Sequence, residues 1–267
     1  MTELLREKFK HAISKNMHVN YTITRNPIII QSYKRKNRPK YPKKITNYIR
    51  INDVDKHFQY IPMKNQTIIK TGYKILKKLQ KTLKSIKKDK EHEVEIRQTD
   101  FFTKEYDEFW GKIAQEIKLA AIRKQETLNW RYMDPRNGHH TVLTARKNDK
   151  ITGYTVIRIN KNRPEYPVGF INDLITLPHD NETAIQLVNE AIKHLDKQNI
   201  NTTLSLGIQG HPHNQALLMN GFIDSTYPLL VYLLGLDREL DVNQLGQIKS
   251  SEMIFHYGDI DSLPTSI

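Results

Sequence analysis

The order of apolar patterns between residues 94 and 234 restricts this chain to few folds. Alternation of apolar and polar residues predicts strands, and apolar residues three or four positions apart predict helices. Along this segment the patterns follow one another as strand, helix, helix, three strands, helix, strand, helix and strand. That order predicts a mixed α/β sheet of the α+β kind, with helices on its faces.

The boundaries of these elements follow from the same patterns. We expect strands at 94–97, 141–145, 151–159, 169–177, 202–208 and 229–234, and helices at 105–118, 122–132, 181–198 and 212–220. Asn148-Asp149 predicts a tight hairpin turn, and Gly221 predicts the end of the last helix. A further short strand is expected at 253–257.

The first ninety residues carry a shorter series of elements. We expect a helix at 2–16, a strand at 19–23, a helix begun by Pro27, a strand at 45–51 and an amphipathic, lysine-rich helix at 66–88. The strand and the helix begun by Pro27 weakly repeat residues 204–221, where Pro212 also follows a strand. Residues 1–60 would then be the second half of a unit that needs a partner for its unpaired edge.

The distribution of charged residues changes near residue 90. The 267 residues carry a net charge of +13, but residues 1–90 hold 24 Lys and Arg against 5 Asp and Glu, and the remainder carries −6. An asymmetry of this size predicts regions with different partners. We therefore expect a partial unit at 1–63, a basic connecting helix at 64–91 and a main domain at 92–267.

Composition excludes several classes of protein. Without cysteine, the chain has no disulfide framework, thiolate zinc site, iron–sulfur cluster or cysteine nucleophile. It also lacks the P-loop, dinucleotide-binding, nucleophile-elbow and zincin motifs. The longest apolar run, 229–236, is too short to cross a bilayer, and the first residues lack the apolar centre of a signal peptide. We therefore expect a cytoplasmic protein.

Four short motifs accompany this element order. They are Leu128-Asn129-Trp130-Arg131-Tyr132, Ile151-Thr152-Gly153-Tyr154, Phe170-Ile171-Asn172-Asp173-Leu174, and a last helix that ends in Gly221-Phe222. In this order and spacing they resemble the GNAT (Gcn5-related N-acetyltransferase) family over about residues 92–260. The first motif resembles the L-N-W-R-Y signature of a tandem-GNAT subgroup. The resemblance implies a GNAT-like acyltransferase fold preceded by a partial GNAT-like half unit.

The resemblance also implies a co-substrate, acetyl-CoA or another acyl-CoA, and no metal. In that family the donor lies against the central strand and the start of the next helix, where free N–H groups and the helix dipole favour phosphate. The implied contacts here are Leu174, Ile175, Thr176, Leu177, Asn181, Thr183, Ala184 and Asn214. The family's Arg-x-x-Gly-x-Gly/Ala pattern is missing, because residues 178–187 contain no glycine, lysine or arginine. The interpretation that we favour for Asp180 and Asn181 is helix capping.

Asp173 is the candidate general base. It alternates with Ile171 and Ile175, so we expect it to be buried, with a pKa raised towards the range of a base. The alternative is a structural carboxylate satisfied by backbone donors or by Arg131. Many family members have a tyrosine general acid four residues before the Gly-Phe pair, but Leu217 occupies that position here.

Trp130, Arg131 and Tyr132 are candidates for an acceptor pocket, in which Arg131 would bind a carboxylate or phosphate. The alternative is that the aromatic residues belong to the core and Arg131 is a buried structural donor. The histidines at 139–140 and 211–213 lack acidic residues at the spacing of a zinc site, so we expect no metal there.

The basic segment 34–44 mixes cations with tyrosine, as nucleic-acid-binding surfaces do. The lysine face of 66–88 is also compatible with an anionic membrane surface. The simplest interpretation is a solvated connecting helix. A nucleic acid or another anionic surface is therefore a candidate partner for residues 1–90 alone.

Together these features favour a GNAT-like N-acyltransferase that moves an acyl group from acyl-CoA to an amine of a sugar or small metabolite. Two alternatives stay open. One is a non-catalytic GNAT-like binding module, and the other is a Fem-type aminoacyl-tRNA-dependent transferase whose tRNA the basic region would hold. The expected protein partner is a second copy, in a homodimer, or a separately encoded first GNAT half.

Overall fold

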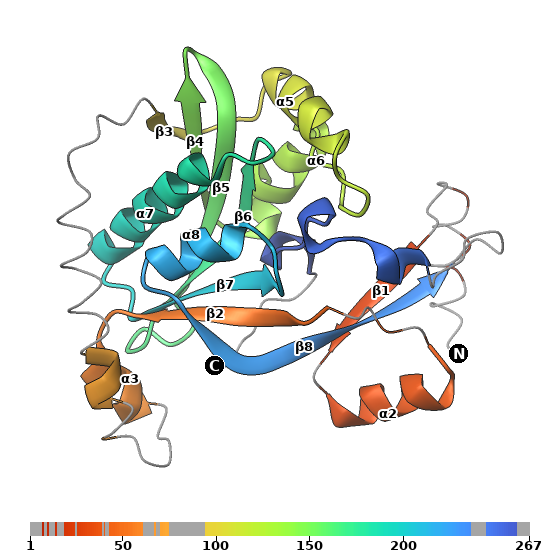
Figure 1. Cartoon of the computed structure of the whole chain (residues 1–267). Coiled ribbons are helices and arrows are strands. Elements are labelled where there is room, and N and C mark those ends of the chain that lie inside the picture. The colour runs from red at the N-terminus through yellow and green to blue at the C-terminus, as the bar shows by residue number, and fades with distance from the viewer. Residues whose placement is uncertain are drawn as a thin grey trace.

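The structure is a computed structural model, which describes residues 19–24, 26–38, 43–60, 70–74, 94–235 and 244–260, with isolated positions at 7, 10, 14, 40 and 67. Its centre is an eight-stranded sheet (Figure 1). The strands are β1 (Val19–Thr24), β2 (Ile45–Ile51), β3 (Glu95–Thr99), β4 (His140–Lys147), β5 (Lys150–Asn160), β6 (Val168–Thr176), β7 (Thr202–Ile208) and β8 (Ile223–Gly235). Their order in space is β1-β8-β2-β7-β6-β5-β4-β3, and only β6 and β7 run parallel.

The helices of the described residues connect and cover these strands. They are α2 (Pro27–Arg35), α3 (Val54–Tyr60), α5 (Glu105–Ala114), α6 (Gln125–Leu128), α7 (Asn181–Lys197) and α8 (His213–Met219). A π-helical turn follows α6 at Asn129–Met133, and 3-10 turns lie at Pro135–Asn137, Gln244–Gln247, Ser250–Glu252 and Tyr257–Asp259. The mixed α/β sheet expected from the sequence is confirmed.

Two predicted helices differ from those observed. The helix expected at 105–118 ends at Ala114, and beyond it the Lys118 N–H donates to the Glu252 carbonyl. The continuous helix expected at 122–132 is wrong, since α6 has a single turn and passes into the π-helical turn. The Asn129 side chain bonds to both backbone groups of Phe102 and holds that turn in place.

Three other differences concern strands and a missed helix. β8 begins at Ile223, before the expected 229, and α3 was not predicted. The strand expected at 253–257 is wrong: Met253 forms one isolated bridge with Leu119, and a 3-10 turn follows. Residues 253–257 are buried against the sheet without pairing as a strand.

The predicted hairpin between β4 and β5 is confirmed. Asn148 and Asp149 have φ angles of 50° and 60°, which is the left-handed conformation that a type I′ turn requires at both central residues. These residue types tolerate that conformation better than most. The turn fixes the register in which β4 pairs with β5.

Helices and loops cover both faces of the sheet. α7 and α8 lie side by side on one face (Figure 1), and α7 buries seven residues there, including Leu187, Val188 and Leu195. α5 forms a second cluster with Phe102, Tyr132 and Tyr154. Residues 244–260 return to the sheet and pack on Phe170 and Leu204. This last segment brings the C-terminal part of the chain close to the central strands.

The four strands β1, β8, β2 and β7 have a symmetric arrangement. β2 pairs antiparallel with β7 on one side and with β8 on the other, and β8 then pairs antiparallel with β1 through residues 230–235. In one half, β1 and α2 precede β2, and β2 crosses to pair with β7. In the other half, β7 and α8 precede β8, and β8 crosses to pair with β1. This is the element order of the weak repeat expected from the sequence.

The domain boundaries at 63 and 91 stay predictions. β1 and β2 belong to the same sheet as the strands after residue 92, so the two regions share a hydrogen-bonded ladder. Most of the lysine-rich segment 66–88 lies outside the described residues. Within it, Tyr73 is buried with Ile51, Val54 and Phe58, and its hydroxyl accepts a hydrogen bond from the Ile51 N–H.

Candidate functional site

The central feature of the sheet is the separation of its two parallel strands. β6 and β7 pair only at residues 168–171 and 202–205. β6 continues to Thr176 and β7 to Ile208 without pairing to each other. A bulge at Asn172 accompanies the separation, because Val156 lies opposite Asp173 and Ile157 opposite Ile171. The strands thus leave an opening between their carboxyl ends.

The hydrogen bonds to β5 show which backbone groups of β6 face this opening. The Leu177 N–H donates to the Thr152 carbonyl, and inward and outward groups alternate along an antiparallel ladder. The backbone of Ile175 therefore faces β5, whereas the backbones of Leu174 and Thr176 face β7. The resemblance implied donor contacts at four residues of this strand, 174–177. Leu174 and Thr176 turn their backbone toward the opening, whereas Ile175 and Leu177 turn theirs toward β5.

Imidazole rings occupy the opening. The His256 ring lies against the Leu174 backbone, and the His213 Nε2 lies 3.1 Å from the Thr176 hydroxyl. The rings of His213 and His256 stack with centroids 6.5 Å apart, and His211 packs edge-on against His213 at 4.6 Å. The Nδ1 atoms of His213 and His256 are buried without a hydrogen-bond partner.

Burial disfavours the charged form of these rings. It lowers the pKa of His211 to about 3 and the pKa of His213 well below its ordinary value, and the neighbouring imidazoles add to both effects. Burial likewise lowers the pKa of His256, against the opposing influence of Asp173. Within the part of the chain that the structure describes, no group of three or more histidine or acidic residues is arranged to hold a metal ion.

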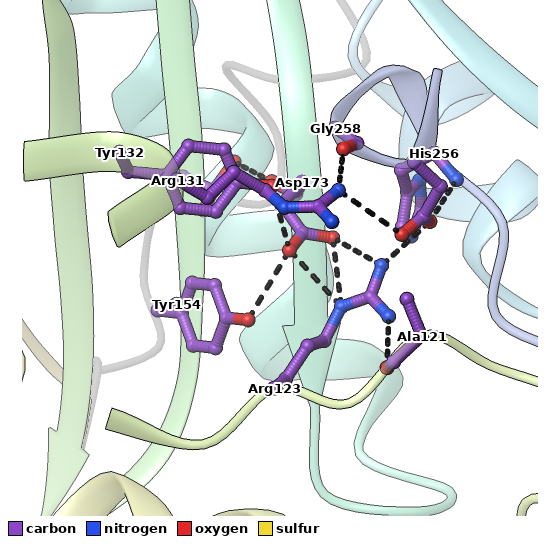
Figure 2. A network of polar contacts seen from close by, with 10 residues as sticks. Ala121, Arg123, Arg131, Tyr132, Tyr154, Asp173, His256 and Gly258 are labelled. Carbon is purple, nitrogen blue, oxygen red and sulfur yellow. Dashed lines mark hydrogen bonds and ion pairs between the residues drawn. The ribbon is translucent and has the colours of Figure 1, made fainter. Parts of the chain in front are cut away.

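Asp173 lies beside the opening and is the centre of a buried ion-pair network (Figure 2). Its carboxylate accepts hydrogen bonds from the Arg123 Nε at 3.0 Å and from the hydroxyls of Tyr132 and Tyr154, each at 3.2 Å. The side chains of Asp173 and Arg123 are 1% and 3% exposed. Every partner is itself fixed in the core or on the segment before α6.

The predicted burial of Asp173 is confirmed, but the predicted rise of its pKa is wrong. Burial by itself raises the pKa, and the Arg123 guanidinium together with His256 outweighs it and holds the pKa below the ordinary value. The carboxylate is thus charged and fully engaged. A catalytic role for Asp173 stays a prediction, and these contacts favour the structural alternative with Arg123 in place of Arg131.

The network continues into the C-terminal segment. The Arg123 Nη2 donates to the Asp259 carboxylate at 2.7 Å, and the same carboxylate accepts the backbone N–H of His256 at 3.0 Å. Arg131 donates to the Gly258 carbonyl and lies 3.7 Å from Asp259 (Figure 2). The segment that carries His256 is therefore anchored to Asp173 through Arg123.

The three predicted acceptor residues do not form one surface. Tyr132 is buried and points to Asp173, Arg131 holds the C-terminal segment, and Trp130 is 59% exposed. Arg123, Asp259 and His256 were not among the site residues predicted from the sequence. Their roles depend on contacts with residues that lie far away in the sequence or on a loop, so local spacing does not mark them.

The start of α7 is already capped. The Asp180 carboxylate accepts the N–H and the hydroxyl of Thr183, and the N–H groups of Asn181 and Ala184 donate to the carbonyls of His179 and Asp180. The capping interpretation of Asp180 is confirmed. These three amides are not free for a phosphate, and the carboxylate adds a negative charge beside them. Asn214 is buried and donates to the Ile208 carbonyl, which ties α8 to β7.

Comparisons with known proteins show what the arrangement resembles. No family model and no curated protein matches the sequence. A GCN5-related N-acetyltransferase from Anabaena variabilis superposes with a TM-score of 0.51 at 10% identity, over 88% of this chain and 50% of that one. The fold is that of the GNAT acyltransferases.

Two further solved structures are similar to parts of this chain. N-myristoyltransferase from Saccharomyces cerevisiae gives a TM-score of 0.50 at 10% identity, over 86% of this chain and 55% of that one. A tandem GNAT protein from the clavulanic acid biosynthesis pathway gives 0.45 at 11% identity, over 89% and 70%. This chain spans about half the length of the Anabaena and yeast proteins. At these identities the likeness concerns the fold alone.

Proposed function

We propose that this protein is an acyltransferase that moves an acyl group from acyl-CoA to an amine of a sugar or small metabolite. One observation carries the proposal: β6 and β7 separate after residues 171 and 205, so the backbone of Leu174 and Thr176 lacks a strand partner on the β7 side. A thioester in this opening would be polarised by backbone donors in a site shielded from water. The amine attacks the thioester carbon, a C–N bond forms, the C–S bond breaks, and the amine proton leaves for solvent or the departing thiolate.

Thermal unfolding with acetyl-CoA tests the donor half of this function. A ligand at about one hundred times its dissociation constant stabilises a folded protein by about 2.7 kcal/mol, which gives a measurable rise in melting temperature. Asp180→Asn should bind acetyl-CoA more tightly, because asparagine still caps the helix and no longer repels the pyrophosphate. No stabilisation of either protein at millimolar acetyl-CoA would exclude an acyl-CoA donor.

The capped start of α7 favours a second candidate. A donor without a pyrophosphate does not need the amides that Asp180 and Thr183 already use. A Fem-type aminoacyl-tRNA-dependent transferase would meet this condition, with the exposed cations of residues 34–36 near its tRNA. Co-purified tRNA whose binding falls steeply with salt would support this candidate. Binding to neither tRNA nor acetyl-CoA would leave a non-catalytic module.

The symmetry of the sheet supports a proposal about the protein partner. The outer edge of β7 pairs with the parallel strand β6, whereas among the described residues the outer edge of β1 pairs with no strand. By symmetry, a parallel strand from a separately encoded first half or from a second copy fits this edge. Light scattering of the purified chain tests the homodimer, and a monomer would leave only the separate chain.

A further inference from the structure

A side chain of the protein, the His256 imidazole, lies in the opening between β6 and β7. We propose that the imidazole of His256 is an internal ligand of the donor site, and that this ring leaves the opening when an acyl donor binds. This inference rests on the acyl-donor site proposed above. It adds a competition between the donor and the C-terminal segment for the same backbone edge.

The first argument is the contact itself. Leu174 points its backbone groups toward β7, where no strand pairs with them, and the His256 ring lies against that backbone. A donor that adds along β6 as an extended chain must use the same backbone groups. The ring and the donor therefore exclude each other at Leu174.

The second argument is the filling of the space. His256 is 6% exposed, its ring stacks on His213, and His213 reaches the Thr176 hydroxyl on the other exposed rung of β6. The two residues of β6 that face the opening, Leu174 and Thr176, thus each lie beside one of the two stacked imidazole rings. Removing one ring opens room beside Leu174, and no change in the sheet is needed.

The third argument concerns how the segment is held. At its two ends, Ile254 donates to the Leu119 carbonyl and Asp259 pairs with Arg123. Phe255 and Tyr257 are buried in the core, and the Tyr257 hydroxyl donates to the Asn47 side chain. Between them, the Nδ1 of His256 has no hydrogen-bond partner. A buried polar atom without a partner lowers the stability of the segment that carries it. The His256 ring is therefore held less firmly than the buried side chains on either side of it.

His57 provides a matched control. Its ring is also buried, at 4% exposed, and its Nδ1 lies 2.5 Å from the Tyr166 hydroxyl. Tyr166 and Thr202 lie at the paired ends of β6 and β7, away from the opening. Loss of this ring removes a buried imidazole without touching Leu174.

The test is calorimetric titration of acetyl-CoA into the wild type, His256→Ala and His57→Ala. We expect the dissociation constant to fall at least tenfold in His256→Ala and to stay unchanged in His57→Ala. Free imidazole, which refills the space, should weaken the binding again in His256→Ala only. Hydrogen exchange of the wild type should become faster in residues 254–259 when acetyl-CoA binds.

Different failures have different meanings. Equal affinity of all three proteins for acetyl-CoA would overturn the internal ligand and leave the acyl-CoA function intact. Slower hydrogen exchange of residues 254–259 when acetyl-CoA binds would have the same meaning. If His256→Ala binds no acetyl-CoA although it is folded by circular dichroism, both the internal ligand and the acyl-CoA function are overturned. If His256→Ala does not fold, His256→Gln provides the same comparison, because its shorter side chain leaves the stack with His213.

Discussion

Replacement of Asp173 by asparagine removes the charge at the centre of the buried network and nearly preserves the shape of the side chain. The carboxylate accepts hydrogen bonds from Arg123 through Nε and Nη2, and from Tyr132 and Tyr154. Loss of one member of a buried ion pair costs about 3–5 kcal/mol, because the remaining charge is left without its partner. Arg123 keeps Asp259 at 2.7 Å and the Ala121 carbonyl at 2.9 Å. We therefore expect the lower end, about 3 kcal/mol.

Urea unfolding at pH 7 measures this loss. With a urea m-value of about 3 kcal/mol/M, the midpoint should fall by about 1 M in Asp173→Asn. Tyr154→Phe is the matched control, since it removes one hydrogen bond to the same carboxylate and no charge, at a cost of about 1 kcal/mol. A loss below about 0.5 kcal/mol in Asp173→Asn, within the range of ordinary surface substitutions, would refute the network as a source of stability.

The dependence on pH provides a second check. The pKa of Asp173 is held below its ordinary value of 3.8, so its stabilisation is complete above that value. It is lost as the pH falls through the lowered pKa. The difference between the wild type and Asp173→Asn should therefore persist from pH 7 to about pH 5 and shrink only in stronger acid. An unchanged acyl-transfer rate in Asp173→Asn would exclude Asp173 as the general base.

Further predictions follow from burial, capping and close contact. Asp180→Ala should lose about 1 kcal/mol in urea unfolding, because the N–H and hydroxyl of Thr183 lose their acceptor; an unchanged midpoint would contradict the cap. Leu187→Ala should lower the free energy of unfolding by about 2–5 kcal/mol in the same assay, since this side chain of α7 is fully buried. Gly207→Ala should lose about 1–3 kcal/mol, because an added methyl group would meet the Tyr48 ring, and stability equal to the wild type would show that this ring can move. Stability should also fall between pH 6.5 and about pH 3, because the unfolded chain binds a proton at His211 that the folded one excludes; His211→Gln should flatten this slope.

Much of the fold was predictable from local patterns. The strand at Thr202–Ile208 and the hairpin at Asn148-Asp149 were expected at the positions observed, and the helix expected at 181–198 ends one residue earlier, at Lys197. A hydrophobic period or a turn residue acts over a few neighbouring positions, so the sequence alone expresses it. The predicted helix at 122–132 failed because its conformation depends on distant contacts. Asn129 bonds to Phe102 and Arg123 reaches Asp173.

The sequence by itself determined the α/β class, the buried position of Asp173 and the division of charge between the two regions. Each is a property of residue types and their spacing. Only the tertiary structure decided the rest. β2 lies between β7 and β8, Arg123 rather than Arg131 neutralises Asp173, and His256 enters the opening beside Leu174. The physical reason is that strand edges and buried charges accept any partner of suitable geometry. The partner actually present is selected by the packing of the whole chain.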